Sequence, residues 1–224
     1  MLILLIVLAL AIFVLPNLWA KWVLKRHTRG RDDYPGTGAE LAEHLIRRMG
    51  VEGVRVERTE QGDHYDPKAR CVRLTPDHYD GRSLTAVTVA AHEVGHAIQH
   101  HEGYAPLLAR SRLVQVAQKA EKLGAILMMA APFLFLLTRL PGGLAMIVVM
   151  AVISFGTAAL VHLVTLPVEF DASFNRALPL LKEYVPPADM AGGRHVLTAC
   201  AFTYVAASLA SVMNLSRWLV ILRR

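Results

Sequence analysis

Long apolar blocks alternate with polar segments along the 224 residues of the chain. The blocks cover residues 2–19, 124–138, 144–166 and 196–222. The second block is short, but it reaches the length of a bilayer-crossing helix when it is extended upstream to about Val116. The pattern predicts about four membrane-spanning helices. These are an N-terminal anchor at 1–20, a hairpin at 123–167 that turns at Arg139–Gly143, and a C-terminal helix at 196–224.

Positive charges follow the first block instead of preceding it, at Lys21, Lys25, Arg26, Arg29 and Arg31. A cleavable signal peptide carries its charges before the apolar core, so this order indicates an uncleaved anchor with its downstream side in the cytoplasm. The polar segments 21–122 and 168–195 are then both expected on the cytoplasmic face.

Within the first polar segment, the pattern predicts one short helix and two strands. Thr37 and Glu40 match a capping box, which opens an amphipathic helix that ends at Gly50. The apolar face of this helix is formed by Leu41, Leu45, Ile46 and Met49. Two alternating stretches, Val54–Arg58 and Ala69–Leu74, predict strands joined by a turn-rich segment at 60–67.

The helix predicted at 83–100 carries the sequence His92-Glu93-Val94-Gly95-His96. Residues four apart lie on one face of a helix, so His92 and His96 can bind one metal ion while Glu93 lies beside them. Two imidazoles suit zinc, and the glutamate can take a proton from a zinc-bound water. The alternative is a surface helix with incidental histidines, but the surrounding residues are small and apolar, and buried polar side chains need partners.

Composition narrows the class of protein further. Hydrophobic residues make up 54% of the chain and its mean hydropathy is +0.38, which is more apolar than an ordinary soluble domain. The net charge is +6, but the basic residues flank the apolar blocks, which favours membrane topology over nucleic-acid binding. Cys71 and Cys200 are too few for a disulfide framework.

A third ligand is expected, because a catalytic zinc usually has three protein ligands and an open position. Glu169 and Asp171 directly follow apolar residues near the end of the third block, where an unpaired carboxylate would be costly. Either could be the donor. The alternative is an acid at a helix end that pairs with Arg176.

The sequence from Ala90 to His100, followed by Glu-Gly-Tyr-Ala-Pro, resembles the YugP-type membrane zinc metallopeptidase family. Asp-His-Tyr-Asp-Pro at 63–67, Tyr-Asp-Gly-Arg-Ser at 79–83 and Leu-Pro-Val-Glu-Phe-Asp-Ala-Ser at 166–173 fit the same family. That family is similar in plan to the HtpX-like gluzincin membrane peptidases. The resemblance covers the chain from about Tyr34 through the last apolar block.

The resemblance implies one zinc ion per chain, with His92, His96 and Glu169 as ligands and Glu93 as the general base. In the HtpX-like pattern an aspartate stands four residues after the ligand glutamate and supports the site. Ser173 stands there in this chain, so Asp171 or Asp66 is a candidate substitute for that role. Candidates for stabilising an oxyanion are His64, Tyr65, His195 and Arg176.

The expected fold class is mainly α: a polytopic α-helical membrane protein with a small cytoplasmic α+β domain of zincin-like metallopeptidase type. The expected function is hydrolysis of unfolded or membrane-proximal polypeptides by a zinc-activated water. An exposed strand, Val54–Arg58 or Ala69–Leu74, would hold the substrate by β-augmentation. The expected partners are the lipid bilayer and polypeptide substrates, without nucleic acid, at a bacterial inner or plasma membrane. The sequence does not indicate an oligomeric state.

Two alternative functions remain open at this point. Site-2-type intramembrane proteases also carry the His-Glu-x-x-His motif, but they add a Leu-Asp-Gly motif that this chain lacks. A non-catalytic membrane adaptor or chaperone with a structural zinc belongs to another class. Structural zinc sites are closed by four protein ligands and do not need a glutamate beside the first histidine.

Overall fold

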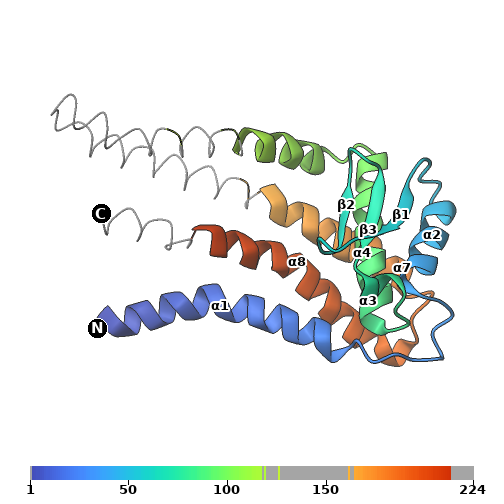
Figure 1. Ribbon diagram of the computed structural model, residues 1–224, viewed down its shortest axis with the longest axis horizontal. Coiled ribbons are helices and arrows are strands. Elements are labelled where there is room, and N and C mark those ends of the chain that lie inside the picture. Colours follow the sequence, from blue (N-terminus) through green and yellow to red (C-terminus); the bar gives the residue numbers. More distant parts are fainter. Residues whose placement is uncertain (1, 118, 120–125, 127–160, 162–163, 213–224) are drawn as a thin grey trace.

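The computed structural model describes residues 2–117, 119, 126, 161 and 164–212, and most of them are helical (Figure 1). The N-terminal elements are α1 (Leu2–Arg26), α2 (Gly38–Arg48), β1 (Arg55–Arg58), β2 (His64–Asp66), β3 (Cys71–Leu74), α3 (Pro76–Tyr79) and α4 (Leu84–His101). The C-terminal elements are the π-helix η1 (Asp171–Ala177), α7 (Leu178–Leu181), the 3₁₀ turn η2 (Pro187–Asp189) and α8 (Met190–Val212). Residues 105–117 and 164–170 are also helical.

The predicted polytopic membrane fold is wrong for the described part of the chain. No helix among the described residues has both the length and the apolar character that crossing a bilayer requires. The fourth apolar block illustrates why the pattern misled: Val196, Leu197 and Cys200 in α8 are buried in a protein core. The predicted hairpin at 123–167 lies almost entirely outside the described residues.

Helix α2 forms as its sequence predicts. The Thr37 side chain accepts a hydrogen bond from the backbone N–H of Glu40, and the Glu40 carboxylate accepts one from the backbone N–H of Thr37 at 2.8 Å. Leu41, Leu45 and Ile46 are buried, as expected for its apolar face. Met49, predicted on the same face, is instead 41% exposed.

The sheet has three strands, in the order β1-β3-β2. Strand β1 pairs in parallel with β3, placing Arg55 opposite Cys71, and β2 pairs antiparallel with β3, placing Tyr65 opposite Val72. The alternation in the sequence predicts only β1 and the central strand β3, and it assigns the residues of β2 to a turn. Because β2 is three residues long, it is too short to show the alternation that identifies a strand.

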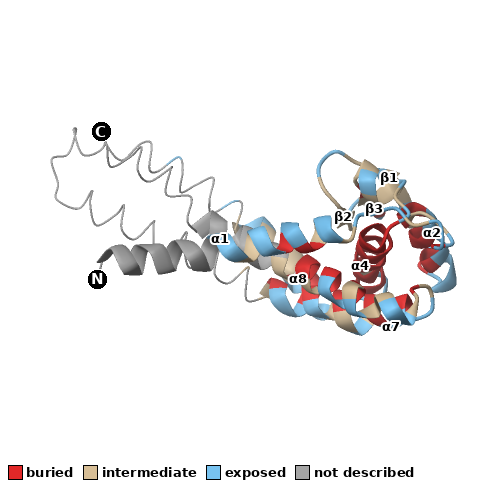
Figure 2. Cartoon of the chain, turned by 90° about the horizontal axis from the view of Figure 1, so that it is seen from below, coloured by how far each residue is buried: buried red, intermediate tan, exposed pale blue. Residues whose placement is uncertain are grey.

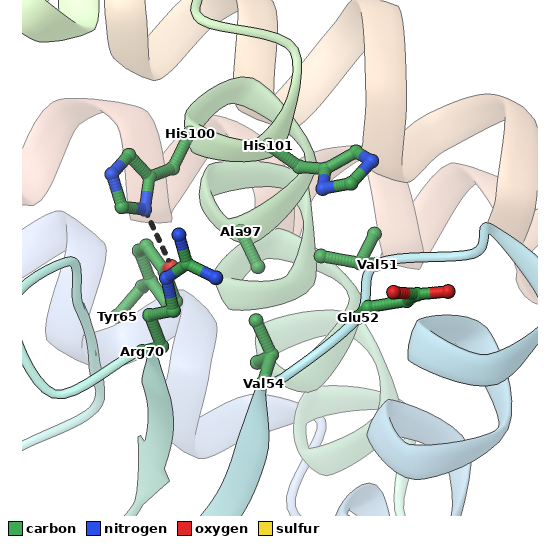
Figure 3. Close-up of a pocket in the computed structure, with 8 residues that line it drawn as sticks. All are labelled: Val51, Glu52, Val54, Tyr65, Arg70, Ala97, His100 and His101. Atoms are coloured by element: carbon green, nitrogen blue, oxygen red, sulfur yellow. Dashed lines mark hydrogen bonds between the residues drawn. The ribbon is translucent and has the colours of Figure 1, made fainter.

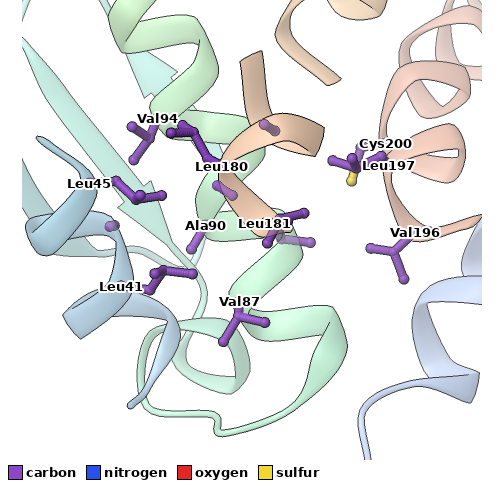
Figure 4. Close-up of a cluster of buried hydrophobic side chains, with 14 of the residues drawn as sticks. Leu41, Leu45, Val87, Ala90, Val94, Leu180, Leu181, Val196, Leu197 and Cys200 are labelled. Atoms are coloured by element: carbon purple, nitrogen blue, oxygen red, sulfur yellow. The ribbon is translucent and has the colours of Figure 1, made fainter. Parts of the chain in front are cut away.

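Helix α4 lies at the centre of the fold, and every residue from Leu84 to Gln99 is buried (Figure 2). The sheet and α2 pack against it, and so do η1, α7 and α8. Figure 4 shows Val87, Ala90 and Val94 of α4 beside apolar side chains of α2 and α7. A helix covered on all sides must be apolar all round, which explains its small Ala, Val and Gly residues. Any charged residue on it must find a partner inside the protein.

Candidate metal centre

Helix α4 holds the first two candidate ligands. The helix begins after Ser83, whose Oγ accepts a hydrogen bond from the backbone N–H of Ala86. His92 and His96 follow one turn apart, with ring centroids 4.8 Å apart and ring planes at 78°. Both side chains are buried, and so is Glu93 between them.

Glu169 reaches the two histidines from the helical residues 164–170 that precede η1. Its Oε2 atom lies 3.3 Å from His92 Nε2 and 3.2 Å from His96 Nε2. Gly95 permits this approach, because a Cβ atom there would come within 2.7 Å of the Ala172 carbonyl oxygen. Each of the three residues thus offers one ligand atom, and these atoms lie within 4.8 Å of one another.

Hydrogen bonds at the far side of each ring determine which nitrogen faces the centre. The Gln99 amide nitrogen donates to the Val168 carbonyl and to Asp171 Oδ2, both at 2.8 Å, so only its oxygen can face His96. This oxygen lies 2.9 Å from His96 Nδ1 and accepts a hydrogen bond from its N–H. His96 therefore presents Nε2 to a metal ion.

Ser173 orients the imidazole of His92 in the same way, through a hydrogen bond at Nδ1. Its Oγ donates to the Leu197 carbonyl oxygen at 3.2 Å and therefore accepts from His92 Nδ1–H at 3.0 Å. The serine that replaces the expected aspartate thus contacts the ligand directly. Asp171 contacts Gln99 and not an imidazole. Asp66 is the last residue of strand β2 and pairs with Arg73 at 2.8 Å.

The pKa values reflect a buried site of mixed charge. Burial would raise the pKa of Glu169, but the imidazoles of His96 and His92 outweigh it and hold that pKa well below its usual range. Burial likewise would lower the pKa of His96, but the Glu169 carboxylate outweighs it and raises that pKa. The pKa of Glu93 is raised, mainly by burial, which brings it towards the range of a general base at neutral pH.

Several polar atoms around this point are buried without a hydrogen-bond partner in the described part of the chain. They include His92 Nε2 and Glu93 Oε2. Buried polar atoms in proteins are normally satisfied, and a bound cation accounts for lone pairs that converge in this way. Two imidazole nitrogens and one carboxylate oxygen are also the ligand set of many catalytic zinc sites. The residues present therefore fit zinc.

The other predicted candidates lie away from the three ligands. His64 Nδ1 is 2.8 Å from the Gly62 carbonyl oxygen, and His195 is exposed on α8. Tyr65 Oη is 2.8 Å from His100 Nδ1, beside a cavity of about 80 Å³ shown in Figure 3, none of whose lining residues is a candidate ligand. Arg176 pairs with Asp171 at 2.6 Å and reaches the centre only through Gln99.

Two residues of the centre are not among the candidates that the sequence predicts. Gln99 has a local signal, because a side chain three residues after His96 lies on the same face of the helix. Arg110, whose Nη1 lies 3.2 Å from Glu169 Oε1, has no such signal. It lies on the helical residues 105–117, and its contact with Glu169 joins segments that are far apart in the sequence.

Comparison with known proteins gives two matches. A family described as "Putative neutral zinc metallopeptidase" matches residues 2–223. The protein named "Putative membrane protease YugP" from Bacillus subtilis (strain 168) is 38% identical over 212 residues, which cover 92% of this chain and 91% of that protein. No solved structure matches the chain.

Proposed function

The chain belongs to the neutral zinc metallopeptidase family, and from that premise we propose that it is a zinc-dependent endopeptidase. His92, His96 and Glu169 would hold the zinc ion. The chemistry that a bound zinc ion supplies is Lewis acidity, which polarises the scissile carbonyl and lowers the pKa of a water molecule towards neutrality.

The observation that carries the proposal is the buried Glu93 beside the ligand set. Its Oε2 has no hydrogen-bond partner in the described part of the chain, so this atom is available to a water molecule. Burial raises the pKa of Glu93, which makes the carboxylate a better proton acceptor. Glu93 would take the proton of the attacking water and deliver it to the leaving amine.

Extended polypeptides are the substrates that the small sheet suits best. Strand β3 is paired on both sides, so the predicted segment Ala69–Leu74 cannot accept a further strand. Among the described residues, β1, which contains the predicted segment, and β2 are both edge strands of the sheet. Tyr65 of β2 contacts His100, one turn beyond His96, so β2 is the edge with a contact to the helix that carries the ligands. We propose that an unfolded or membrane-proximal polypeptide pairs with this edge by β-augmentation.

The place of action is proposed from the relative, which is named a membrane protease. We extend membrane association to this chain, at the bacterial inner or plasma membrane and with the catalytic residues on the cytoplasmic side. The basic residues Lys21, Lys25 and Arg26 at the end of α1 support this side, because the negatively charged cytoplasmic leaflet attracts basic segments.

A structural zinc site in a non-catalytic adaptor is the competing function. Such a site has four protein ligands, whereas the centre offers three within the described residues. Glu93 would also have no task in a structural site. Both features favour the peptidase.

The test compares the full-length wild type with Glu93→Gln for zinc content and for cleavage of unfolded casein. Both should bind about one zinc per chain, and Glu93→Gln should cleave at least about 100-fold more slowly, because general-base catalysis contributes that much. Glu43→Gln is the matched control, since this exposed glutamate forms only a surface pair with Arg47. Equal cleavage by wild type and Glu93→Gln would overturn the role of Glu93, and zinc-loaded wild type that cleaves no unfolded protein would favour the adaptor.

A further inference from the structure

The two oxygen atoms of Glu169 have different surroundings. Oε2 faces the imidazoles, at 3.2 Å and 3.3 Å from their Nε2 atoms. Oε1 lies 3.2 Å from Nη1 of Arg110 in an ion pair. The Glu169 side chain is fully buried and the Arg110 side chain is 20% exposed, so water screens this pair only weakly.

This division matters because a carboxylate can bind a metal ion through one oxygen or through both. Two imidazoles and one carboxylate oxygen leave a fourth position on zinc for water, as catalytic sites require. If Oε1 also turned to the ion, the carboxylate would occupy a further position next to the water. The Arg110 guanidinium opposes this turn of Oε1 towards the ion. Its positive charge attracts Oε1 and repels a metal ion that approaches that oxygen.

We propose that Arg110 is a positioning residue that holds Glu169 as a one-oxygen ligand and so keeps a coordination position open. The inference rests on the proposed function, since it concerns the same metal centre. It assigns a role to Arg110, which belongs neither to the His-Glu-x-x-His motif nor to the segment around Glu169. Arg110 lies between these two in the sequence, on the helical residues 105–117.

Cobalt(II) bound to the full-length protein in place of zinc tests this directly, because its visible absorption weakens as the coordination number rises. The wild type should show the intense spectrum of a four-coordinate ion. Arg110→Met, which keeps an unbranched side chain but removes the guanidinium charge, should show a weaker spectrum of higher coordination number. Its kcat with zinc should fall about 10- to 100-fold with KM nearly unchanged.

Arg110→Lys and Arg112→Met are the matched variants. The lysine retains the positive charge and should restore most of the wild-type spectrum. Arg112 is exposed two residues further along the same helix, on a different face, so Arg112→Met should behave as wild type. Arg110→Gln serves as a second neutral variant, and circular dichroism of each variant checks its folding.

A wild-type cobalt spectrum in folded Arg110→Met or Arg110→Gln would overturn the inference. If turnover nevertheless fell in those variants, Arg110 would act on the substrate and not on Glu169. Either result leaves the proposed function intact. The proposed function itself fails if the wild type takes up neither cobalt nor zinc, whatever the Arg110 variants do.

Discussion

At the scale of single residues, the centre orients both imidazoles with neutral partners. The Ser173 hydroxyl and the Gln99 amide oxygen each accept a hydrogen bond from an Nδ1–H. The Ser173 hydroxyl in turn donates to a backbone carbonyl, and the Gln99 amide nitrogen donates to a backbone carbonyl and to Asp171. An aspartate in place of Ser173 would add a third carboxylate to a buried cluster that already holds Glu93 and Glu169. Like charges in such a cluster repel, so a neutral acceptor orients His92 without that cost.

Replacing Ser173 by alanine should therefore weaken zinc binding. His92 Nδ1–H would lose its acceptor, and loss of such a partner typically lowers metal affinity about 10- to 100-fold. Competition with a chromophoric chelator measures the zinc dissociation constant. Ser111→Ala is the control, because Ser111 Oγ donates to the Leu107 carbonyl and contacts no imidazole. An unchanged dissociation constant in Ser173→Ala would show that the hydroxyl does not orient the ligand.

Zinc affinity should also depend on pH above the usual range of histidine. Without metal, burial would lower the pKa of His96, but Glu169 outweighs it and raises that pKa above 6.5. Zinc must displace a proton from His96 wherever the pH is below this raised pKa, so affinity falls as pH decreases through it. Titrations between about pH 8 and about pH 6 should show the decline beginning above the ordinary histidine pKa of about 6.5. An affinity that is constant down to that pH would contradict the coupling of His96 to Glu169.

The sequence predicts that His92, Glu93 and His96 lie close together, because the geometry of one helical turn fixes their relative positions. Glu169 lies 73 residues after His96, so the sequence pattern alone does not decide whether Glu169 or Asp171 is the third ligand. The resemblance to a known family implies that Glu169 is the ligand. Arg110 and Ser173 act through contacts between segments far apart in the sequence, and such contacts leave no trace in a local pattern.

At the scale of elements, the close contact between α4 and η1 determines the geometry of the centre. Gly95 has no side chain where the Ala172 carbonyl approaches α4. The seven-residue π-helix η1 carries Asp171 to Gln99 and Ser173 to His92. Short π-helical segments are rare and often occur at functional sites, where they redirect side chains.

Gly95→Ala should separate these two elements. The new Cβ would come within 2.7 Å of a backbone oxygen that cannot move independently of η1. We expect a loss of about 1–3 kcal/mol in the free energy of unfolding, together with weaker zinc binding. Gly30→Ala is the control, because nothing lies within 4 Å of a Cβ at Gly30. Since alanine favours helix formation over glycine by about 1 kcal/mol, a stabilised Gly95→Ala would show that the contact is not tight.

The sequence predicts the helices that have a capping residue and an apolar pattern of their own, but it does not predict strand β2 or the pairing of the strands. The capping box at Thr37 and Glu40 identified α2, and the apolar run after Ser83 identified α4. Strand β2 has no signal beyond the turn residues that flank it. The parallel pairing of β1 with β3 is a contact between separate segments, which alternation along each strand does not specify.

At the scale of the whole molecule, one buried helix organises both the core and the centre. Helix α4 contacts the sheet, α2, η1, α7 and α8, and the candidate ligands come from α4 and from the helical residues before η1. Hydropathy cannot distinguish burial in protein from burial in lipid, which is why the residues at the start of α8 were read as a membrane span. A metal ion would link α4 to the segment that carries Glu169, so metal binding and folding should be coupled.

The most direct test of this account is the zinc content of the full-length wild type, Glu169→Gln and Glu93→Gln after dialysis against the same low zinc concentration. The account predicts about one zinc per chain in wild type and in Glu93→Gln, because Glu93 is not a ligand. Glu169→Gln should lose most of its zinc, because it lacks the charged ligand that joins the two segments. Full zinc retention by folded Glu169→Gln would contradict the assigned centre.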